Sequence, residues 1–165
     1  MTSTDGTGLD DDSVDFPALE RDFVRRFVPT FEWVSYPRPS PRQPLQIPLT
    51  QARVGLISTA GVHQAGEAPL RSDGEARMVP LDGERLALDH VGYDTQRASA
   101  DPEVVFPAQT LLAMADDGLV ASVAPLAVST MGFVPKGADI FERTLPVARD
   151  SLRDQEVDLA LLVPA

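Results

Sequence analysis

Apolar residues recur at helical spacing near the start of the chain. Six of them follow one another at intervals of three or four residues: Phe16, Leu19, Phe23, Phe27, Phe31 and Val34. That period is typical of one face of an amphipathic helix, so we expect a helical segment over residues 13–36 that packs on the core. Asp15 can cap it and Pro17 suits its first turn, whereas Pro29 should kink or break it.

The segments on either side of this helix lack any such period. Residues 1–12 are polar and acidic, and we expect them to be a disordered leader. Residues 37–50 are rich in proline and predict an extended connector.

Short apolar runs predict strands in the remainder, residues 51–165. ARVGLIS, residues 52–58, indicates a buried strand followed by a glycine-bearing loop. ARMVPL and RLALD flank Asp82 and Gly83, a turn signal that favours a hairpin. One or two short strands are expected around Pro125 within 119–134, and residues 157–163 predict a buried strand.

Two helices alternate with these strands. One begins after Pro107 and ends at Gly118, and a second runs through residues 137–156 with a kink or break at Pro146. Alternating strands and helices favour an α/β fold with a mainly parallel sheet and flanking helices. We therefore expect residues 13–165 to form a single α/β domain.

Composition excludes several classes of protein. The net charge of −11 argues against a nucleic-acid or anionic-membrane partner, because phosphate binding needs clustered Lys and Arg. The chain has no Cys, which removes disulfides, thiolate metal sites and a thiol nucleophile. No membrane-length apolar stretch and no secretory signal is visible, so a cytoplasmic location is expected.

Both histidines of the chain follow predicted strands. His63 and His90 lie at or just beyond strand carboxyl ends, where loops of an α/β sheet converge, so we expect them to approach one pocket. Imidazole suits proton transfer, and Asp89, Tyr93 or Asp94 could orient it. Two other interpretations stay open: that each histidine is a structural or exposed loop residue, and that both bind a metal, although their separation matches no local ligand motif.

Familiar nucleotide and hydrolase motifs are absent. Gly61 and Gly66 do not form a Gly-x-Gly-x-x-Gly or Walker loop, so no nucleotide site is supported. Ser58, Ser129 and Thr130 lie outside any Gly-x-Ser-x-Gly pattern and are better suited to contact a ligand or satisfy the backbone.

Four stretches together resemble a known family. VGLISTAGVHQAGEAPL, LDHVGYDTQRASADPEVVFPAQTLLAMADDGLV, STMGFVP and VDLALLVPA resemble the selenoprotein B component of the glycine, sarcosine, betaine and D-proline reductases and its shorter relatives, from about Phe31 to Ala165. The resemblance implies a flavodoxin-like α/β fold and reductive cleavage of a carbon–heteroatom bond. In that family a selenocysteine or cysteine, closely followed by a second cysteine, comes directly after a strand like LALLVP.

The resemblance also implies a site on this chain. His63 and His90 would be the catalytic residues, as acid/base or substrate-orienting groups. The expected substrate-binding residues come from the loops and strand ends around them: Thr59, Gly61, Tyr93, Asp94, Asp101, Phe106, Ser129, Met131 and Gly132. The expected partners are a small-molecule substrate and either further copies of the chain or a complementary reductase subunit. We expect no bound cofactor or metal.

The sequence departs from the family where the chalcogen should follow, since it ends at Ala165 without any Cys. We expect the Sec/Cys pair on a missing segment or a partner, and the sheet to be incomplete at its C-terminal end. The chain would be a fragment, one half of a split enzyme, or a homologue that has lost its nucleophile. Two alternatives remain: a non-catalytic ligand-binding or scaffold subunit that pairs with an active homologue, and a histidine-based metal-dependent hydrolase or lyase.

Overall fold

The computed structural model describes residues 15–32, 39, 41, 43–82, 85–92 and 94–165. These residues fall into two compact units, Met1–Gln43 and Pro44–Ala165. Gly83 of the expected hairpin turn and Tyr93 of the expected site lie outside the described residues.

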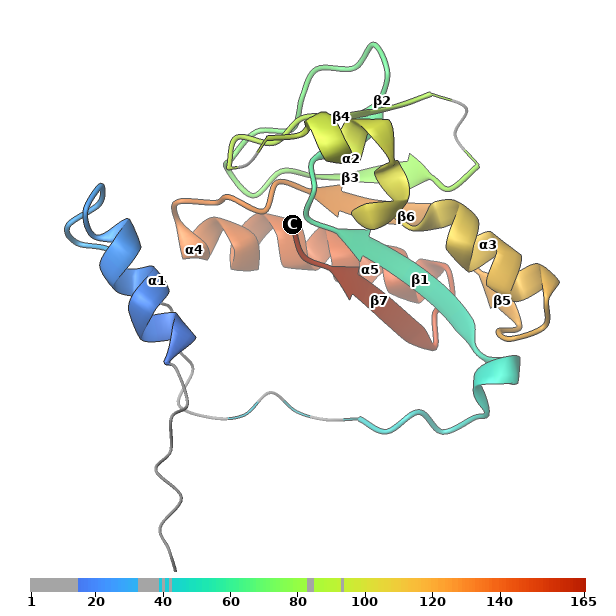
Figure 1. Cartoon of the computed structure of the whole chain (residues 1–165). Helices are drawn as coiled ribbons and strands as arrows, with labels where there is room; N and C mark the ends of the chain where they lie inside the picture. Colours follow the sequence, from blue (N-terminus) through green and yellow to red (C-terminus); the bar gives the residue numbers. More distant parts are fainter. Residues whose placement is uncertain (1–14, 33–38, 40, 42, 83–84, 93) are drawn as a thin grey trace, which may run out of the picture. The chain divides into compact units, whose positions relative to one another are not determined.

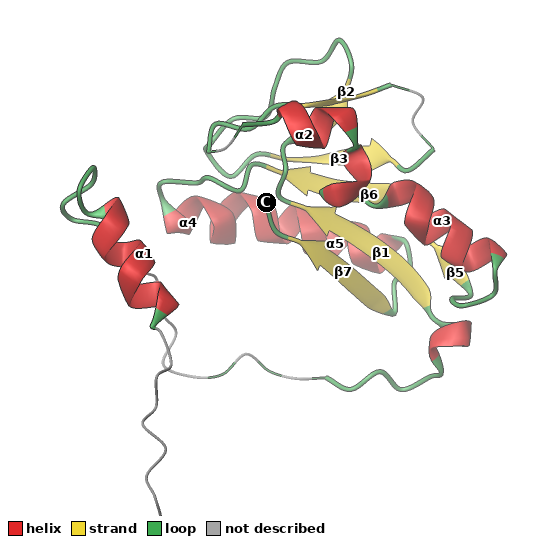
Figure 2. Cartoon of the chain, in the orientation of Figure 1, coloured by secondary structure: helices red, strands yellow, loops and turns green. Residues whose placement is uncertain are grey.

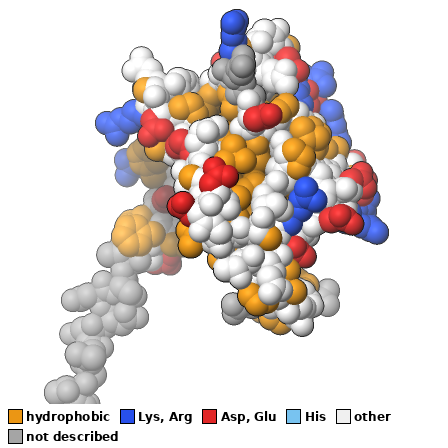
Figure 3. All heavy atoms as spheres, turned by 90° about the vertical axis from the view of Figure 1, so that its right-hand side faces the viewer, with side chains coloured by type: hydrophobic (Ala, Val, Ile, Leu, Met, Phe, Trp, Pro, Cys, Tyr) orange, Lys and Arg blue, Asp and Glu red, His pale blue; other side chains and the backbone are white. Residues whose placement is uncertain are grey.

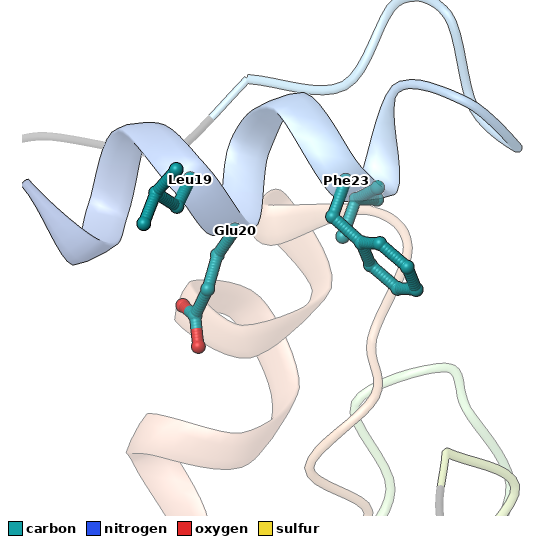
Figure 4. Close-up of a pocket in the computed structure, with 4 residues that line it drawn as sticks. Leu19, Glu20 and Phe23 are labelled. Carbon is teal, nitrogen blue, oxygen red and sulfur yellow. The ribbon is translucent and has the colours of Figure 1, made fainter.

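The described part of the first unit contains one amphipathic helix, α1, Phe16–Val24. Asp15 caps it as expected, because its carboxylate accepts from the Ala18 amide at 3.0 Å, and a proline occupies the first turn. The helix is shorter than the periodicity predicted, and it ends before Pro29, whose ring disfavours a helical residue ahead of it. None of its residues is buried, and Figure 4 shows Leu19 and Phe23 projecting from the helix.

The second unit is built on a five-stranded sheet with β1, Arg53–Ser58, at its centre (Figure 1). Three strands run parallel to β1. On one side β1 pairs with β5, Ser122–Val123, and then with β6, Leu126–Thr130; on its other side it pairs with β7, Leu159–Val163. The fifth strand, β3, Ala76–Pro80, runs antiparallel to β6. The expected α/β class and mainly parallel sheet are confirmed.

Helices cover both faces of this sheet (Figure 2). A Cβ added to Gly55 of β1 would stand 2.8 Å from Leu152 of α5, Leu145–Asp154, which therefore packs directly on one face. On the opposite face Leu111 of α3, Ala108–Asp116, joins the hydrophobic core that contains Leu56. Burying apolar side chains on both faces is what a parallel sheet requires.

Proline and glycine residues lie at the starts and ends of the helices, as their backbone chemistry predicts. Pro107 precedes α3, and Gly118, with φ +71°, lies just beyond its end. Pro146 lies in the first turn of α5, directly after a π-helical segment, Ile140–Thr144, because its nitrogen has no proton to donate. The remaining helical segments are short: Leu49–Gln51, α2 (Gln96–Ala100), Pro102–Val104 and α4 (Gly137–Asp139). In the described part of the chain no helix has the length and hydropathy to cross a membrane.

The expected hairpin between the flanks of Asp82 and Gly83 is wrong. β3 pairs with β6 instead, and β4, Leu86–Leu88, forms a separate two-stranded antiparallel sheet with β2, Val62–Gln64. The loop predicted after β1 thus contains a strand, because Val62–Gln64 finds its partner more than twenty residues away rather than locally.

The prediction that residues 157–163 form a buried strand is correct for the strand and wrong for its burial. β7 has β1 as its single partner among the described strands, so its other edge is open in this part of the chain. Leu162 is 61% exposed, and Leu159 and Leu161 are 39% exposed. An apolar run alone does not distinguish an interior strand from an edge strand, because both can be equally hydrophobic.

Candidate functional site

Three parallel strands have their carboxyl ends side by side; we call this end of the sheet the carboxyl edge. Thr59 follows β1, Gly132 follows β6 by two positions, and Ala165 follows β7 by two. The Ala165 amide donates to Thr59 Oγ1 at 2.8 Å, and the Thr59 amide donates to the Val163 carbonyl at 3.1 Å. A Cβ on Gly132 would stand 2.5 Å from the Ala165 carbonyl oxygen. The ends of these strands are therefore in direct contact.

His90 lies at this edge with a defined proton position. Its Nε2 is 3.1 Å from the point where a Cβ on Gly132 would stand. The Gly92 amide donates to its Nδ1 at 2.9 Å, so the proton of the neutral ring must be on Nε2. Partial burial lowers the pKa of His90, which favours that neutral ring. The arrangement places an N–H donor beside the three strand ends.

His63 is in a different environment from His90. It lies on β2 and is only 2% exposed. Its Nδ1 is 3.1 Å from the Ala87 carbonyl, and its Nε2 is 3.4 Å from a carboxylate oxygen of Asp89. The ring thus joins β2 to β4 and to the residue before His90. That the two histidines share one substrate pocket stays a prediction.

The other expected substrate-binding residues divide into two groups. One group lies at or just below the carboxyl edge: Thr59, Gly61, Ser129, Met131 and Gly132. The backbone of Gly61, at φ +71°, packs so closely on Asp89 that a Cβ would be 2.1 Å from the Asp89 carbonyl oxygen. Ser129 is fully buried, and its hydroxyl has no hydrogen-bond partner in the part of the chain that the structure describes.

The second group has local structural partners. Asp94 accepts from the Gln96 amide at the start of α2, and Asp101 accepts from the Glu103 amide at the next helical turn. Phe106 is 1% exposed and belongs to the hydrophobic core. These contacts are those of caps and core, and a substrate role for the three residues stays a prediction.

Sequence reasoning missed two residues that shape the site. Gly92 supplies the amide that sets the His90 tautomer, and the Ala87 carbonyl receives the His63 ring. The spacing His-x-Gly offered a weak signal for the first, because side chains often bond to an amide two positions along. Nothing local could have indicated the second.

Two hollows elsewhere in the molecule do not include His90 or the strand ends. One, of about 640 Å³, is lined by residues of β4, α3 and neighbouring loops, among them Leu81, Arg85, Leu86, Phe106 and Gln109. The other is formed by four residues of α1 alone, three of which are labelled in Figure 4.

The face shown in Figure 3 has no continuous basic surface, because its Lys and Arg side chains are interspersed with Asp and Glu. This distribution agrees with the net charge of −11 and offers no polyanion-binding surface on that face. Within the described ranges, no three His, Cys, Asp or Glu residues are grouped closely enough to hold a metal ion.

One curated protein shows a distant similarity to the chain. D-proline reductase subunit gamma of Acetoanaerobium sticklandii is 28% identical over 123 residues, which are 72% of this chain and 51% of the relative. The chain therefore spans about half the length of the relative that it matches. No protein-family model matches, and no solved structure matches significantly. The similarity establishes a distant relationship between this chain and the D-proline reductase family.

Proposed function

We propose that this chain is a subunit or N-terminal portion of a selenoprotein-B-like reductase, which binds a small substrate for reductive cleavage of a carbon–heteroatom bond. The observation that carries the proposal is the position of His90, whose Nε2–H lies beside the converging ends of β1, β6 and β7. The distant relationship to a reductase subunit supports the same reaction class. Ligands of α/β proteins bind at the carboxyl ends of the strands, which is where His90 lies.

The nucleophile must come from outside these 165 residues, because they contain no Cys. A selenocysteine or cysteine pair would supply a chalcogen nucleophile and the thiol that is oxidised as the substrate is reduced. The strand ends offer a place for it: Ala165, Thr59 and Gly132 are in contact, and His90 is their neighbour. A chalcogen-bearing segment at those strand ends would lie next to Gly132, against which the His90 Nε2 atom packs.

His90 serves in this proposal as an orienting hydrogen-bond donor rather than as a proton shuttle. Adding a second proton would place it on Nδ1 and break the bond from the Gly92 amide. Burial opposes the charged ring as well. The neutral ring can donate through Nε2–H to the carboxylate of a small amino-acid substrate while the carbon–heteroatom bond is broken elsewhere.

Association with another chain is part of the proposal. The relative is named as one subunit of an enzyme, and β7 presents an uncharged edge with three exposed leucines. Exposed apolar strand edges favour pairing with another chain.

Substrate binding and turnover test the proposal separately. We expect glycine, sarcosine, betaine or D-proline to shift the ring NMR signals of His90 in the purified chain, and His90→Gln to weaken the binding of that compound about tenfold. With dithiothreitol the chain alone should give no product, and addition of a selenocysteine- or cysteine-bearing partner should give turnover.

Three results would contradict the proposal. Product formation by the chain alone would require another nucleophile. Failure of all four compounds to perturb His90 would remove the substrate site. The chalcogen-bearing partner should first be shown to be active with a full-length homologue of this chain. If that partner gives no turnover with this chain although the chain binds substrate, the chain is a non-catalytic ligand-binding subunit instead.

A further inference from the structure

We infer that His63 is a positioning residue: its ring clamps Asp89 to strand β2 and thereby fixes the place of the adjacent His90. The use that a reaction makes of His90 rests on the proposed function, but the clamp can be tested without any reaction.

The first half of the clamp is the anchoring of His63 itself. A carbonyl oxygen can only accept a hydrogen bond, so the contact from His63 Nδ1 to the Ala87 carbonyl requires a proton on Nδ1. With 2% exposure, the ring has no freedom to turn this proton toward water. Nε2 is then the atom that faces Asp89, and when it is also protonated it donates to the carboxylate.

The second half is the attachment of Asp89. Among the described residues, its backbone makes one long hydrogen bond, from its amide to the Gly61 carbonyl at 3.4 Å. Its side chain is 56% exposed, and one of its carboxylate oxygens lies 3.4 Å from Nε2 of His63. The contact between the exposed Asp89 side chain and the buried His63 ring is therefore a second attachment of the segment at Asp89, which its long backbone hydrogen bond holds only weakly.

The clamp acts on His90 because the two residues are consecutive. The His90 ring lies in a narrow space: a Cβ on Gly92 would be 2.9 Å from its Cε1, and one on Gly132 would be 3.1 Å from its Nε2. A small displacement of Asp89 would therefore alter both the bond from the Gly92 amide and the direction of Nε2–H.

Nuclear magnetic resonance can observe both rings individually, since the chain contains two histidines. In chain labelled with ¹⁵N-histidine, long-range ¹H–¹⁵N correlations identify the protonated nitrogens. We expect different states of the two rings: His63 with protons on both Nδ1 and Nε2, and His90 with its proton on Nε2 alone. A His63 ring that lacks a proton on either nitrogen, or a His90 ring protonated on Nδ1, would overturn the inference.

Matched variants then break each half of the clamp. Asp89→Ala should shift the His90 ring signals and make exchange of the Gly92 amide proton about tenfold faster, because the local opening becomes easier. His63→Asn keeps a donor at the Nδ1 position for Ala87 and loses the reach to Asp89, so it should give the same result. His63→Gln keeps a donor at the Nε2 position and should restore the His90 signals in part.

Asp94→Ala is the control, because Asp94 lies in the same loop region and accepts from the Gln96 amide without touching His63 or His90 among its described contacts. Backbone amide spectra report whether each variant is folded, and Asp89→Ala changes an exposed side chain that the core does not need. If that folded variant leaves the His90 signals and the Gly92 exchange rate at their wild-type values, the clamp does not exist. Loss of the clamp would leave substrate shifts at His90 measurable, and absence of those shifts would leave the clamp signals intact, so the two proposals fail separately.

Discussion

The backbone amide of Ala165 donates to Oγ1 of Thr59 at 2.8 Å, although 106 positions separate them in the sequence. The bond joins the residue after β1 to the second residue after β7, beyond the last main-chain ladder contact between these strands. Gly132, after β6, closes against the same two residues. Small size at position 132 is therefore a requirement of the candidate site.

Replacement of Gly132 by alanine should damage the strand ends and the His90 environment together. The new Cβ would lie 2.5 Å from the Ala165 carbonyl oxygen and 3.1 Å from His90 Nε2, so backbone has to move. We expect a loss of about 1–3 kcal/mol in the free energy of unfolding and shifted His90 ring signals. Gly137→Ala is the control, since nothing lies within 4 Å of its Cβ position. Urea denaturation and histidine NMR measure both effects, and equal behaviour of the two variants would contradict the prediction.

A second glycine pair separates steric contact from backbone strain. Gly61 and Gly66 both have positive φ, but only a Cβ on Gly61 meets another group, the Asp89 carbonyl oxygen at 2.1 Å. Gly66→Ala should cost about 1 kcal/mol in unfolding free energy through strain alone. Gly61→Ala should cost clearly more and should displace His90, because Asp89 must move. A Gly61→Ala variant with the stability and His90 spectrum of Gly66→Ala would show that this contact is unimportant.

Protonation of His90 should weaken the fold as the pH falls. Burial lowers its pKa below the usual 6.5, so over the interval between the two values the unfolded chain binds more protons than the folded one. The contribution to stability is complete above 6.5 and is lost as the pH falls through the lowered pKa. Urea unfolding between about pH 7.5 and pH 5 should show this loss in the wild type and a smaller one in His90→Gln. A His90 ring that titrates above 6.5 would contradict the prediction.

The open edge of β7 should cause association in solution. We expect wild-type chain at micromolar concentration to have a mass greater than one chain in light scattering. Leu162→Lys should shift the mass toward a single chain, because a lysine on an edge strand opposes pairing, and Leu162 is already 61% exposed. The control is Val104→Lys, at an exposed apolar position outside the strand. A wild-type mass of one chain would exclude self-association through this edge.

The sequence alone determined the boundaries of several local elements and the fold class. Pro107 and Gly118 delimit α3, Pro125 separates β5 from β6, and Pro146 marks the start of α5, since the backbone chemistry of proline and glycine acts within a few residues. The alternation of strands and helices predicted the mainly parallel sheet, and the lack of cysteine determined that a chalcogen nucleophile cannot come from these residues.

Tertiary structure decided the partners of those elements and, with them, the site. β3 and β4 read as a hairpin, yet each pairs elsewhere, because strand pairing is selected by packing across the whole sheet rather than by the intervening turn. β7 reads as an interior strand and lies at the edge of the described sheet. The two histidines looked alike in sequence. In the structure His63 is buried beside Asp89, and a main-chain amide determines which nitrogen of His90 carries the proton. Both outcomes depend on contacts that the local sequence does not encode.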